Sequence, residues 1–231
     1  MPSYDVHLLI TSATRLEASP FLASHSPGNT SEPGMFSFSM QGYPCGFLVT
    51  GVGVPLTLTN LWKHVALKPP ALLINIGIAG SYLPELQPGM VVQVEEDAYG
   101  DIGLEREDDF VTLYEAHLAN PDEKPFMGGK LKNPAPAIID GVKAVNGLTV
   151  NASSGNIQTA RKRHEKFNAD IETMESAAVF HFCLERSIPF LALRAVSNYA
   201  GESDKNRWKI DEAVKNLNQV LHVYLELLLN N

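Results

Sequence analysis

Two glutamates stand where a carboxylate could do chemistry. Glu175 precedes a stretch from Ala177 to Leu184 that is almost entirely apolar and predicts a buried helix. Burying a carboxylate costs free energy unless a partner pairs with it, so Glu175 is expected to have a binding partner. Glu17 lies in TRLE (14–17), close to a predicted strand end. Carboxylates near glycine turns indicate an enzyme-like site, but they do not specify its reaction.

Each of these residues also has a purely structural interpretation. TRLE fits a capping box, in which Thr14 caps a helix and Glu17 reaches back to it. Glu175 lies in the first turn of its predicted helix, where an acid complements the helix dipole. Asn198, taken alone, would be a turn residue. Spacing by itself leaves these alternatives open.

The sequence lacks the motifs of several other common kinds of functional site. The seven histidines are isolated, with no two spaced three or four apart, and no CxxC occurs, so no metal site is expected. GVGVPL (51–56) lacks a third glycine and is a weak dinucleotide fingerprint. Neither a GxxxxGK[ST] loop nor a GxSxG turn is present. We therefore expect no metal and no organic cofactor.

The charge and composition of the chain argue against several classes of protein. The net charge of −8 and the pI near 5.3 argue against a nucleic-acid partner. Cys45 and Cys183 lie in apolar surroundings and are expected to be buried thiols in a reducing compartment. No run reaches the roughly 18 apolar residues of a membrane helix, and the first residues do not resemble a secretion signal. These features predict a cytoplasmic protein without a membrane partner.

Apolar runs alternate with helical patterns along the whole chain. Strands are expected at 4–11, 36–40, 45–53, 71–80, 89–101, 147–155 and 188–201, and the stretch 105–147 is expected to be the least regular. Helices are expected after Thr14, at 55–67, from the end of the strand at 147–155 to about residue 166, at 177–184, and from about residue 208. The pattern predicts one α/β domain, 1–231, around a parallel or mixed sheet. Ligands bind such sheets at the carboxyl ends of strands, where 11–17, 77–80, 151–156, 173–175 and 197–198 fall.

Four segments together resemble the purine nucleoside phosphorylase/nucleosidase superfamily. They are SATRLEA (12–18), NIGIAGSY…LQPGMVVQVEEDAYGD (75–101), ETMESAAV (172–179) and LRAVSNYAG (193–201). The resemblance implies a three-layer α/β/α sandwich with a central mixed sheet, and a homo-oligomer, most often a dimer. Within the superfamily, 77–105 together with Asn198 is most similar to the futalosine hydrolases of the alternative menaquinone pathway.

The resemblance also implies roles for the acids. Glu175 would bind the ribose hydroxyls and stabilise the sugar cation that develops as the N-glycosidic bond breaks. Met174 would pack on the sugar and the base. Glu17 would be the general base that activates a water molecule, with Arg194 helping to position that water.

Asn198 stands where adenine-specific relatives carry aspartate. An asparagine accepts a hydrogen bond from a protonated N7 and donates to a 6-oxo group, which predicts hypoxanthine rather than adenine as the leaving base. Asn156 is expected at the base edge. The remaining expected wall residues are Ile78, Ala79, Gly80, Ser154, Gly155 and Ser197.

The group on the 5′ carbon is expected to meet an aromatic wall. By position, Trp208 resembles the aromatic residue that covers this group in the nucleosidases, although it could equally be an ordinary core or interface residue. Leu104 falls in a segment that often enters the neighbouring subunit's site. Arg106 and Arg207 are candidates for a cation that faces the substrate's carboxylate.

Water is the expected nucleophile. Where phosphorylases of the superfamily carry phosphate-binding residues, this chain has Asn75 and Ile78, which offer no cation. The resemblance thus implies hydrolysis of futalosine, a purine nucleoside, to hypoxanthine and dehypoxanthine futalosine. The alternatives are a methylthioadenosine/S-adenosylhomocysteine nucleosidase, a 6-oxopurine nucleoside phosphorylase and a non-catalytic nucleoside-binding module.

Overall fold

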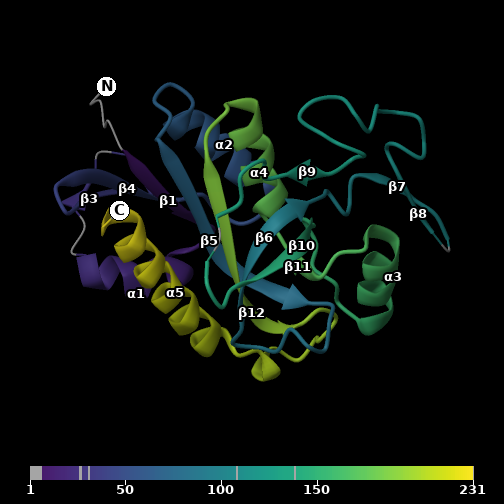
Figure 1. The fold of residues 1–231 in the computed structure, drawn as a ribbon. Helices are drawn as coiled ribbons and strands as arrows, with labels where there is room; N and C mark the ends of the chain where they lie inside the picture. The colour runs from purple at the N-terminus through teal and green to yellow at the C-terminus, as the bar shows by residue number, and fades with distance from the viewer. Residues whose placement is uncertain (1–6, 26–27, 31, 108, 138, 231) are drawn as a thin grey trace.

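The computed structural model describes residues 7–25, 28–30, 32–107, 109–137 and 139–230 (Figure 1). Its helices are α1 (Arg15–His25), α2 (Val54–Val65), α3 (Ile157–Phe167), α4 (Ser176–Glu185) and α5 (Ile210–Asn230), with a short 3-10 helix at Lys205–Arg207. Its strands are β1 (Leu8–Ser12), β2 (Gly28–Asn29), β3 (Met35–Met40), β4 (Tyr43–Val49), β5 (Leu72–Ser81), β6 (Val91–Asp97), β7 (Gly103–Glu105), β8 (Phe110–Thr112), β9 (Leu131–Lys132), β10 (Lys143–Thr149), β11 (Ile171–Thr173) and β12 (Phe190–Tyr199).

Ten of the described strands form one mixed sheet with β5 near its centre. Its order is β11-β10-β6-β12-β5-β1-β4-β3-β2, and β9 pairs with β6. β5 runs parallel to β1 at its start and to β12 along nearly its whole length, and its last residues, Gly80 and Ser81, also pair antiparallel with β11. Because β5 also pairs with β12, the strands β5, β12, β6, β10 and β11 close into a ring. The ring brings the ends of β5, β11 and β12 together.

Helices cover both faces of the sheet (Figure 1). One core joins α1 and α5 to β1, β4, β5 and β12, and a second core joins α2 and α4 to the opposite face. The central strands β1 and β12 are buried on both faces, which explains their nearly continuous apolar runs. The three-layer α/β/α sandwich with a mixed sheet is therefore confirmed.

Helix α4 is enclosed by protein, as its apolar sequence predicts. Its residues 176–180, 182 and 183 are buried, and it packs between the sheet and α2. Trp62 of α2 contacts Phe182 of α4 edge to face. This packing holds the N-terminus of α4, and with it Glu175, at the end of β11.

Several strand boundaries differ from the expectation; for example, the strand expected at 89–101 is β6, Val91–Asp97. The strand expected at 147–155 is β10, Lys143–Thr149. Its pairing with β6 begins at Lys143, and the sequence KAVN (143–146) has no strong apolar pattern that would indicate a strand. The strand expected at 45–53 ends at Val49, since Gly51 and Gly53 adopt a φ of 87° and turn the chain into α2. Residues 4–6 of the first expected strand lie outside the described residues.

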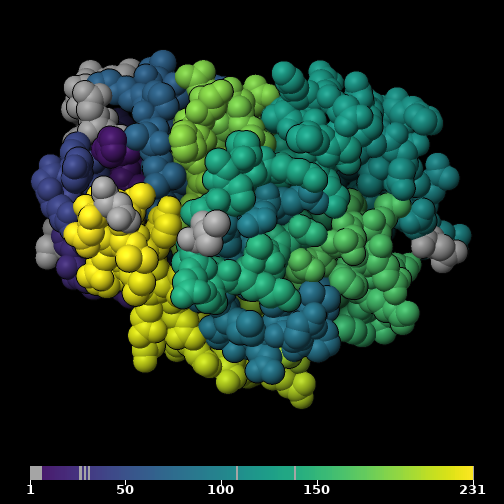
Figure 2. Space-filling view, viewed as in Figure 1, coloured from purple at the N-terminus to yellow at the C-terminus, as the bar shows by residue number. Residues whose placement is uncertain are grey.

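Before β10 begins at Lys143, the segment expected to be irregular contains only short strands. It holds the β7–β8 hairpin and β9, and in the space-filling view its teal atoms form a continuous layer beside α3 (Figure 2). Among the helices that the structure describes, none combines the length and the apolar character needed to cross a membrane.

Asp97 is a buried acid at the end of β6. Its Oδ1 accepts a hydrogen bond from Thr149 Oγ1 at 2.9 Å, and its Oδ2 has no side-chain or backbone partner among the described residues. Burial raises the pKa of Asp97 to about 7, although hydrogen bonds and the charge of Arg194 oppose the rise. Gly147 accommodates this carboxyl, because a Cβ there would lie 2.2 Å from Oδ2.

We predict that Asp97 makes stability depend on pH. Its pKa in the folded state, about 7, exceeds the ordinary value of 3.8, so folding binds a proton between these pH values. The free energy of unfolding should fall as pH rises from about 4 to 7, by at most about 4 kcal/mol. Asp97→Asn should remove this part of the slope in urea denaturation at pH 5.5, 6.3 and 7. Identical slopes for both proteins would contradict the prediction.

Candidate active site

A cavity of about 240 Å³ lies where β5, β11 and β12 end. Ten of the residues expected at the site line it: Glu17, Ile78, Ala79, Gly80, Ser154, Met174, Glu175, Ser197, Asn198 and Trp208. They come from six separate segments of the chain, which the ring of strands brings together. Leu16 and Val52 also line the cavity, and both are about half exposed, so the cavity opens on their side.

Glu17 is held by two sets of donors. Its Oε2 accepts hydrogen bonds from the backbone N–H and the hydroxyl of Thr14 at 2.8 and 2.9 Å, and its own N–H reaches Thr14 Oγ1 at 3.5 Å. The expected capping box is therefore present. The other oxygen, Oε1, accepts from the N–H of Ile78 at 3.2 Å and faces the cavity end of β5. One carboxylate thus caps α1 and also borders the site.

Glu175 occupies the N-cap position of α4 but does not cap the helix with its side chain. Its Oε1 accepts a hydrogen bond from the N–H of Gly53 at 2.9 Å. Burial raises the pKa of Glu175, and the nearby charge of Glu17 adds to the rise, whereas the Gly53 N–H and the charge of Arg194 lower it. Glu17 is therefore close enough to Glu175 for its charge to act on that carboxyl.

Arg194, which is expected to help position the water, lies beneath the cavity rather than in its lining. It is 1% exposed, and it donates to the carbonyl oxygens of Leu193 at 2.8 Å and Asn75 at 3.3 Å, as well as to Asn75 Oδ1. A Cβ on Gly77 would lie 3.2 Å from Glu17 Oε1 and 3.4 Å from Arg194 Cζ. Because position 77 carries no side chain, the guanidinium of Arg194 and the carboxylate of Glu17 both have room beside it.

The charge of Arg194 links it to the acids of the site. Burial lowers the pKa of Arg194, while the charges of Glu175, Glu17 and Asp97 raise it. Its Nε has no hydrogen-bond partner among the described residues. One buried cation therefore compensates the negative charge of the carboxylates at the strand ends.

Asn198 is oriented by its neighbours in β12. Its Oδ1 accepts a hydrogen bond from Ser197 Oγ at 2.7 Å, and its Nδ2 donates to the carbonyl oxygen of Tyr199 at 2.9 Å. A primary amide has two lone pairs and two N–H groups, so one acceptor and one donor position remain. Asn198 can therefore both accept from a ligand and donate to it.

Three residues expected to bind the substrate, including Leu104 from the segment expected to enter a neighbouring subunit's site, lie outside the cavity lining. Asn156 is the N-cap of α3, and its Oδ1 accepts from the N–H of Thr159 at 2.9 Å, so its side chain serves the helix. Gly155 is exposed, and a Cβ there would meet open space. Leu104 pairs with Val111 in the β7–β8 hairpin and is 43% exposed.

The two cation candidates are also elsewhere. Arg207 forms an ion pair with Glu202 at 3.1 Å and is largely exposed. Arg106 is exposed and borders a separate cavity beside α3. The described residues that line the site include no lysine or arginine.

Glu172 is a site residue that the sequence analysis missed. It is 6% exposed, lines the cavity and lies in the middle of β11. The sequence signal that could have identified Glu172 is an acid inside the strand-like segment ADIET (169–173), directly before Met174 and Glu175.

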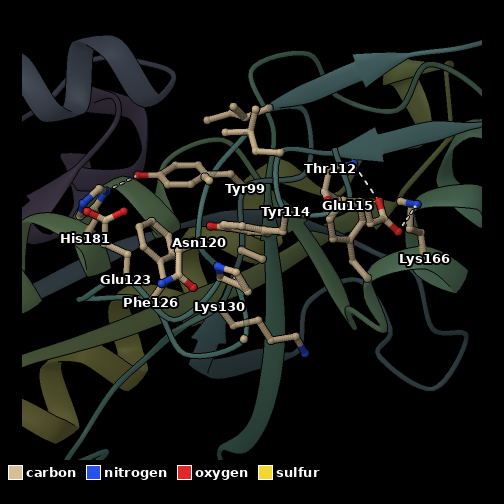
Figure 3. Close-up of a pocket in the computed structure, with 18 of the residues that line it drawn as sticks. Tyr99, Thr112, Tyr114, Glu115, Asn120, Glu123, Phe126, Lys130, Lys166 and His181 are labelled. Atoms are coloured by element: carbon tan, nitrogen blue, oxygen red, sulfur yellow. Dashed lines mark hydrogen bonds and ion pairs between the residues drawn. The ribbon is translucent and has the colours of Figure 1, made fainter. Parts of the chain in front are cut away.

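A larger cavity of about 640 Å³ lies elsewhere, between 112–130, α3 and α4 (Figure 3). Tyr99, Tyr114 and Phe126 form aromatic walls, and Tyr99 is within hydrogen-bond distance of His181 Nδ1 at 3.2 Å. Lys166 pairs with Glu115 at 3.0 Å. None of the residues expected at the site lines this cavity. No group of three or more His, Cys, Asp or Glu among the described residues could hold a metal ion.

Comparisons with known proteins agree with this architecture. A family model described as the phosphorylase superfamily matches residues 7–228. Futalosine hydrolase from Thermus thermophilus is 31% identical over 221 residues, which cover 90% of this chain and 91% of that protein. Futalosine hydrolase from Streptomyces coelicolor is 28% identical over 226 residues, with 90% and 91% covered.

Solved structures share the fold at low identity. The 5′-methylthioadenosine/S-adenosylhomocysteine nucleosidase of Neisseria meningitidis superposes with a TM-score of 0.74 at 17% identity, covering 93% of this chain and 96% of that one. Futalosine hydrolase of Helicobacter pylori superposes with a TM-score of 0.71 at 14% identity, covering 94% and 98%. The match of the family model along nearly the whole chain leads to one conclusion: the chain belongs to the phosphorylase superfamily.

Proposed function

We propose that this protein is a futalosine hydrolase, which cleaves the N-glycosidic bond of futalosine with water to release hypoxanthine and dehypoxanthine futalosine. The observation that carries the proposal is that Glu17 and Glu175 line one cavity at the strand ends. Two curated relatives that share about 30% of their residues with this chain bear that name.

Glu175 is proposed to stabilise the sugar as the bond breaks. The bonding electrons leave with the base, which takes a proton from solvent water at N7, and the ribosyl group becomes an oxocarbenium-like cation. A buried carboxylate near the ribose hydroxyls attracts that cation most strongly at the transition state, when the positive charge is largest. Met174, beside Glu175 in the cavity wall, would pack on the sugar and the base.

Glu17 is proposed to accept the proton of the attacking water. Water adds to C1′ of the cation and becomes acidic as it does so, which allows a carboxylate to take the proton. Hydrogen bonds from Thr14 and Ile78 fix the orientation of this base. Arg194, below Gly77, would position it through charge.

The surroundings favour water over phosphate as the nucleophile. A phosphate dianion in this cavity would face the carboxylates of Glu17, Glu172 and Glu175, without a lysine or arginine in the described lining. Asn75, at a position that phosphorylases use for phosphate, donates instead to the carbonyl and hydroxyl oxygens of Thr11 at 3.3 and 3.0 Å. Both features disfavour a bound dianion.

Asn198 is proposed to read the departing base. Its free lone pair would accept from the protonated N7, and its free N–H would donate to the 6-oxo oxygen of hypoxanthine. A 6-amino group would place two donors against each other. Ala79, Gly80 and Ser197 would form the floor beneath the ring.

The group on the 5′ carbon is proposed to leave the cavity past an apolar rim. Leu16, Val52 and Trp208 line the cavity, and the Trp208 ring is held by a hydrogen bond from Nε1 to the Glu202 carbonyl at 3.1 Å. A flat aromatic substituent would pack against such a rim.

We further propose a single-domain, cytoplasmic enzyme of menaquinone biosynthesis that works as a homodimer without metal or organic cofactor. Cys45 and Cys183 are buried free thiols, as is usual in a reducing compartment. Leu104 and Met127 are large exposed apolar side chains outside the site, as a surface that meets a second subunit would require.

Product analysis tests the proposed reaction. The protein should convert futalosine to hypoxanthine and the free sugar, and added phosphate should change neither the rate nor the products. Methylthioadenosine and inosine, assayed in parallel, should react far more slowly. Formation of a sugar 1-phosphate would show a phosphorylase, and recovery of intact futalosine after long incubation would overturn the proposed activity.

Glu175→Gln should lower kcat by about 10²- to 10³-fold, because the amide keeps the shape but loses the charge that stabilises the sugar cation. The matched control is Glu165→Gln on α3, whose carboxylate pairs with Arg161 at an exposed position. Steady-state rates with futalosine measure both. Equal rates for the two variants would contradict the assigned role.

Asn198→Asp should shift preference toward a 6-amino substrate. An aspartate accepts from both the protonated N7 and an exocyclic amino group, so the ratio of 6-oxo to 6-amino kcat/KM should fall by roughly tenfold or more. Competing futalosine and its 6-amino analogue in one reaction measures this ratio directly. An unchanged ratio would show that Asn198 only shapes the turn.

A further inference from the structure

Glu172 is a buried carboxylate in the cavity wall that the proposed mechanism does not use. In the sheet, Gly80 of β5 pairs with Glu172 of β11 on one side and with Asn198 of β12 on the other. Neighbouring strands lie about 4.8 Å apart, so the two residues flank Gly80 at roughly twice that separation. A flat ring above Gly80 would meet Asn198 along one edge and Glu172 along another.

The carboxylate of Glu172 is fixed by surrounding donors. Oε2 accepts from Ser154 Oγ at 2.6 Å, Tyr82 Oη at 2.7 Å and an N–H of Arg163 at 3.0 Å. Oε1 accepts from the N–H of Ser154 at 2.7 Å. Burial, followed by the charge of Glu172, raises the pKa of Tyr82, so its hydroxyl remains a donor.

This arrangement leaves one acceptor position free. A carboxylate oxygen carries two lone pairs, so the three donors at Oε2 saturate it, whereas Oε1 has one donor and one lone pair left. Because Glu172 lines the cavity, this lone pair is available to a ligand. A group that satisfies it must be a hydrogen-bond donor.

We propose that Glu172 determines base specificity by accepting a hydrogen bond from N1–H of a 6-oxopurine. This inference rests on the proposed function, since it assumes that a purine occupies the cavity. In hypoxanthine, N1 carries a hydrogen beside the 6-oxo group, and N7 lies on the other side of that group. Asn198 at N7 and O6 and Glu172 at N1 would together read three adjacent positions of the ring.

The same contact rejects adenine. In a 6-aminopurine, N1 has no hydrogen and presents a lone pair, which would face the negative charge of Glu172. The carboxylate would then lose a charge-assisted hydrogen bond and gain a repulsive contact. Glu172 would thus discriminate at a ring atom that Asn198 does not contact.

Binding of two free bases to two proteins tests the proposal. Hypoxanthine and 1-methylhypoxanthine share the 6-oxo group and N7, so Asn198 meets the same atoms in both, but only hypoxanthine has N1–H. Wild type should bind hypoxanthine more tightly by roughly tenfold to hundredfold in calorimetry. Glu172→Gln, which keeps the shape without the charge, should reduce this preference by about tenfold.

A purely structural role for Glu172 gives a different result. If the residue only holds Ser154 and its loop, Glu172→Gln should weaken both bases equally, and the preference should not change. Tyr82→Phe is the matched control, because it removes one donor to Oε2 but keeps the charge of Glu172. This variant should preserve the preference even where it weakens both bases.

Two outcomes would overturn the inference. One is equal affinity of wild type for hypoxanthine and 1-methylhypoxanthine, a measurement that holds even if Glu172→Gln fails to fold. The other is an unchanged preference in a folded Glu172→Gln protein. Free-base binding does not depend on turnover, so a protein that prefers hypoxanthine but leaves futalosine intact would refute the proposed reaction and not this inference.

Discussion

The site depends on one buried cation beneath several carboxylates. Arg194 is 1% exposed in the central strand β12 and bonds to Asn75 and to backbone carbonyls. Its charge lowers the pKa values of Asp97 and Glu175, which burial raises. Without a cation at this place, Glu175 would lose a main stabiliser of its anionic form, and the proposed electrostatic role requires the anion.

The fold makes this arrangement possible because its strands form a ring. β5 pairs with β12 along nearly its whole length, with β1 at its start and with β11 at its end, so residues distant in sequence meet at Gly77 and Gly80. Both positions lack a side chain where neighbours approach closely. A Cβ at Gly77 would contact Glu17 and Arg194, and one at Gly80 would lie 3.4 Å from Asn198 Nδ2. Gly77 thus leaves room for Glu17 and Arg194, and Gly80 keeps the floor of the cavity open to a ligand.

Much of the site could be predicted from sequence, because four segments resemble the superfamily and their polar residues lie near the ends of strands or just before the apolar helix α4. Glu17, Glu175 and Asn198 lie at such positions, and all three line the cavity. Asn156 was placed at the base edge, although an asparagine directly before a helix also fits an N-cap, which is its observed role. Local pattern could not show that β10 begins at Lys143 or that Glu172 enters the site, because both depend on pairing between strands.

The central claim is that water, activated by Glu17, attacks a sugar cation held by Glu175. Single-turnover hydrolysis of futalosine in water enriched in ¹⁸O tests it most directly, with mass spectrometry of both products. The account predicts one ¹⁸O atom at C1′ of the released sugar and none in hypoxanthine. A product without ¹⁸O at C1′, after correction for exchange of the free sugar, would contradict it.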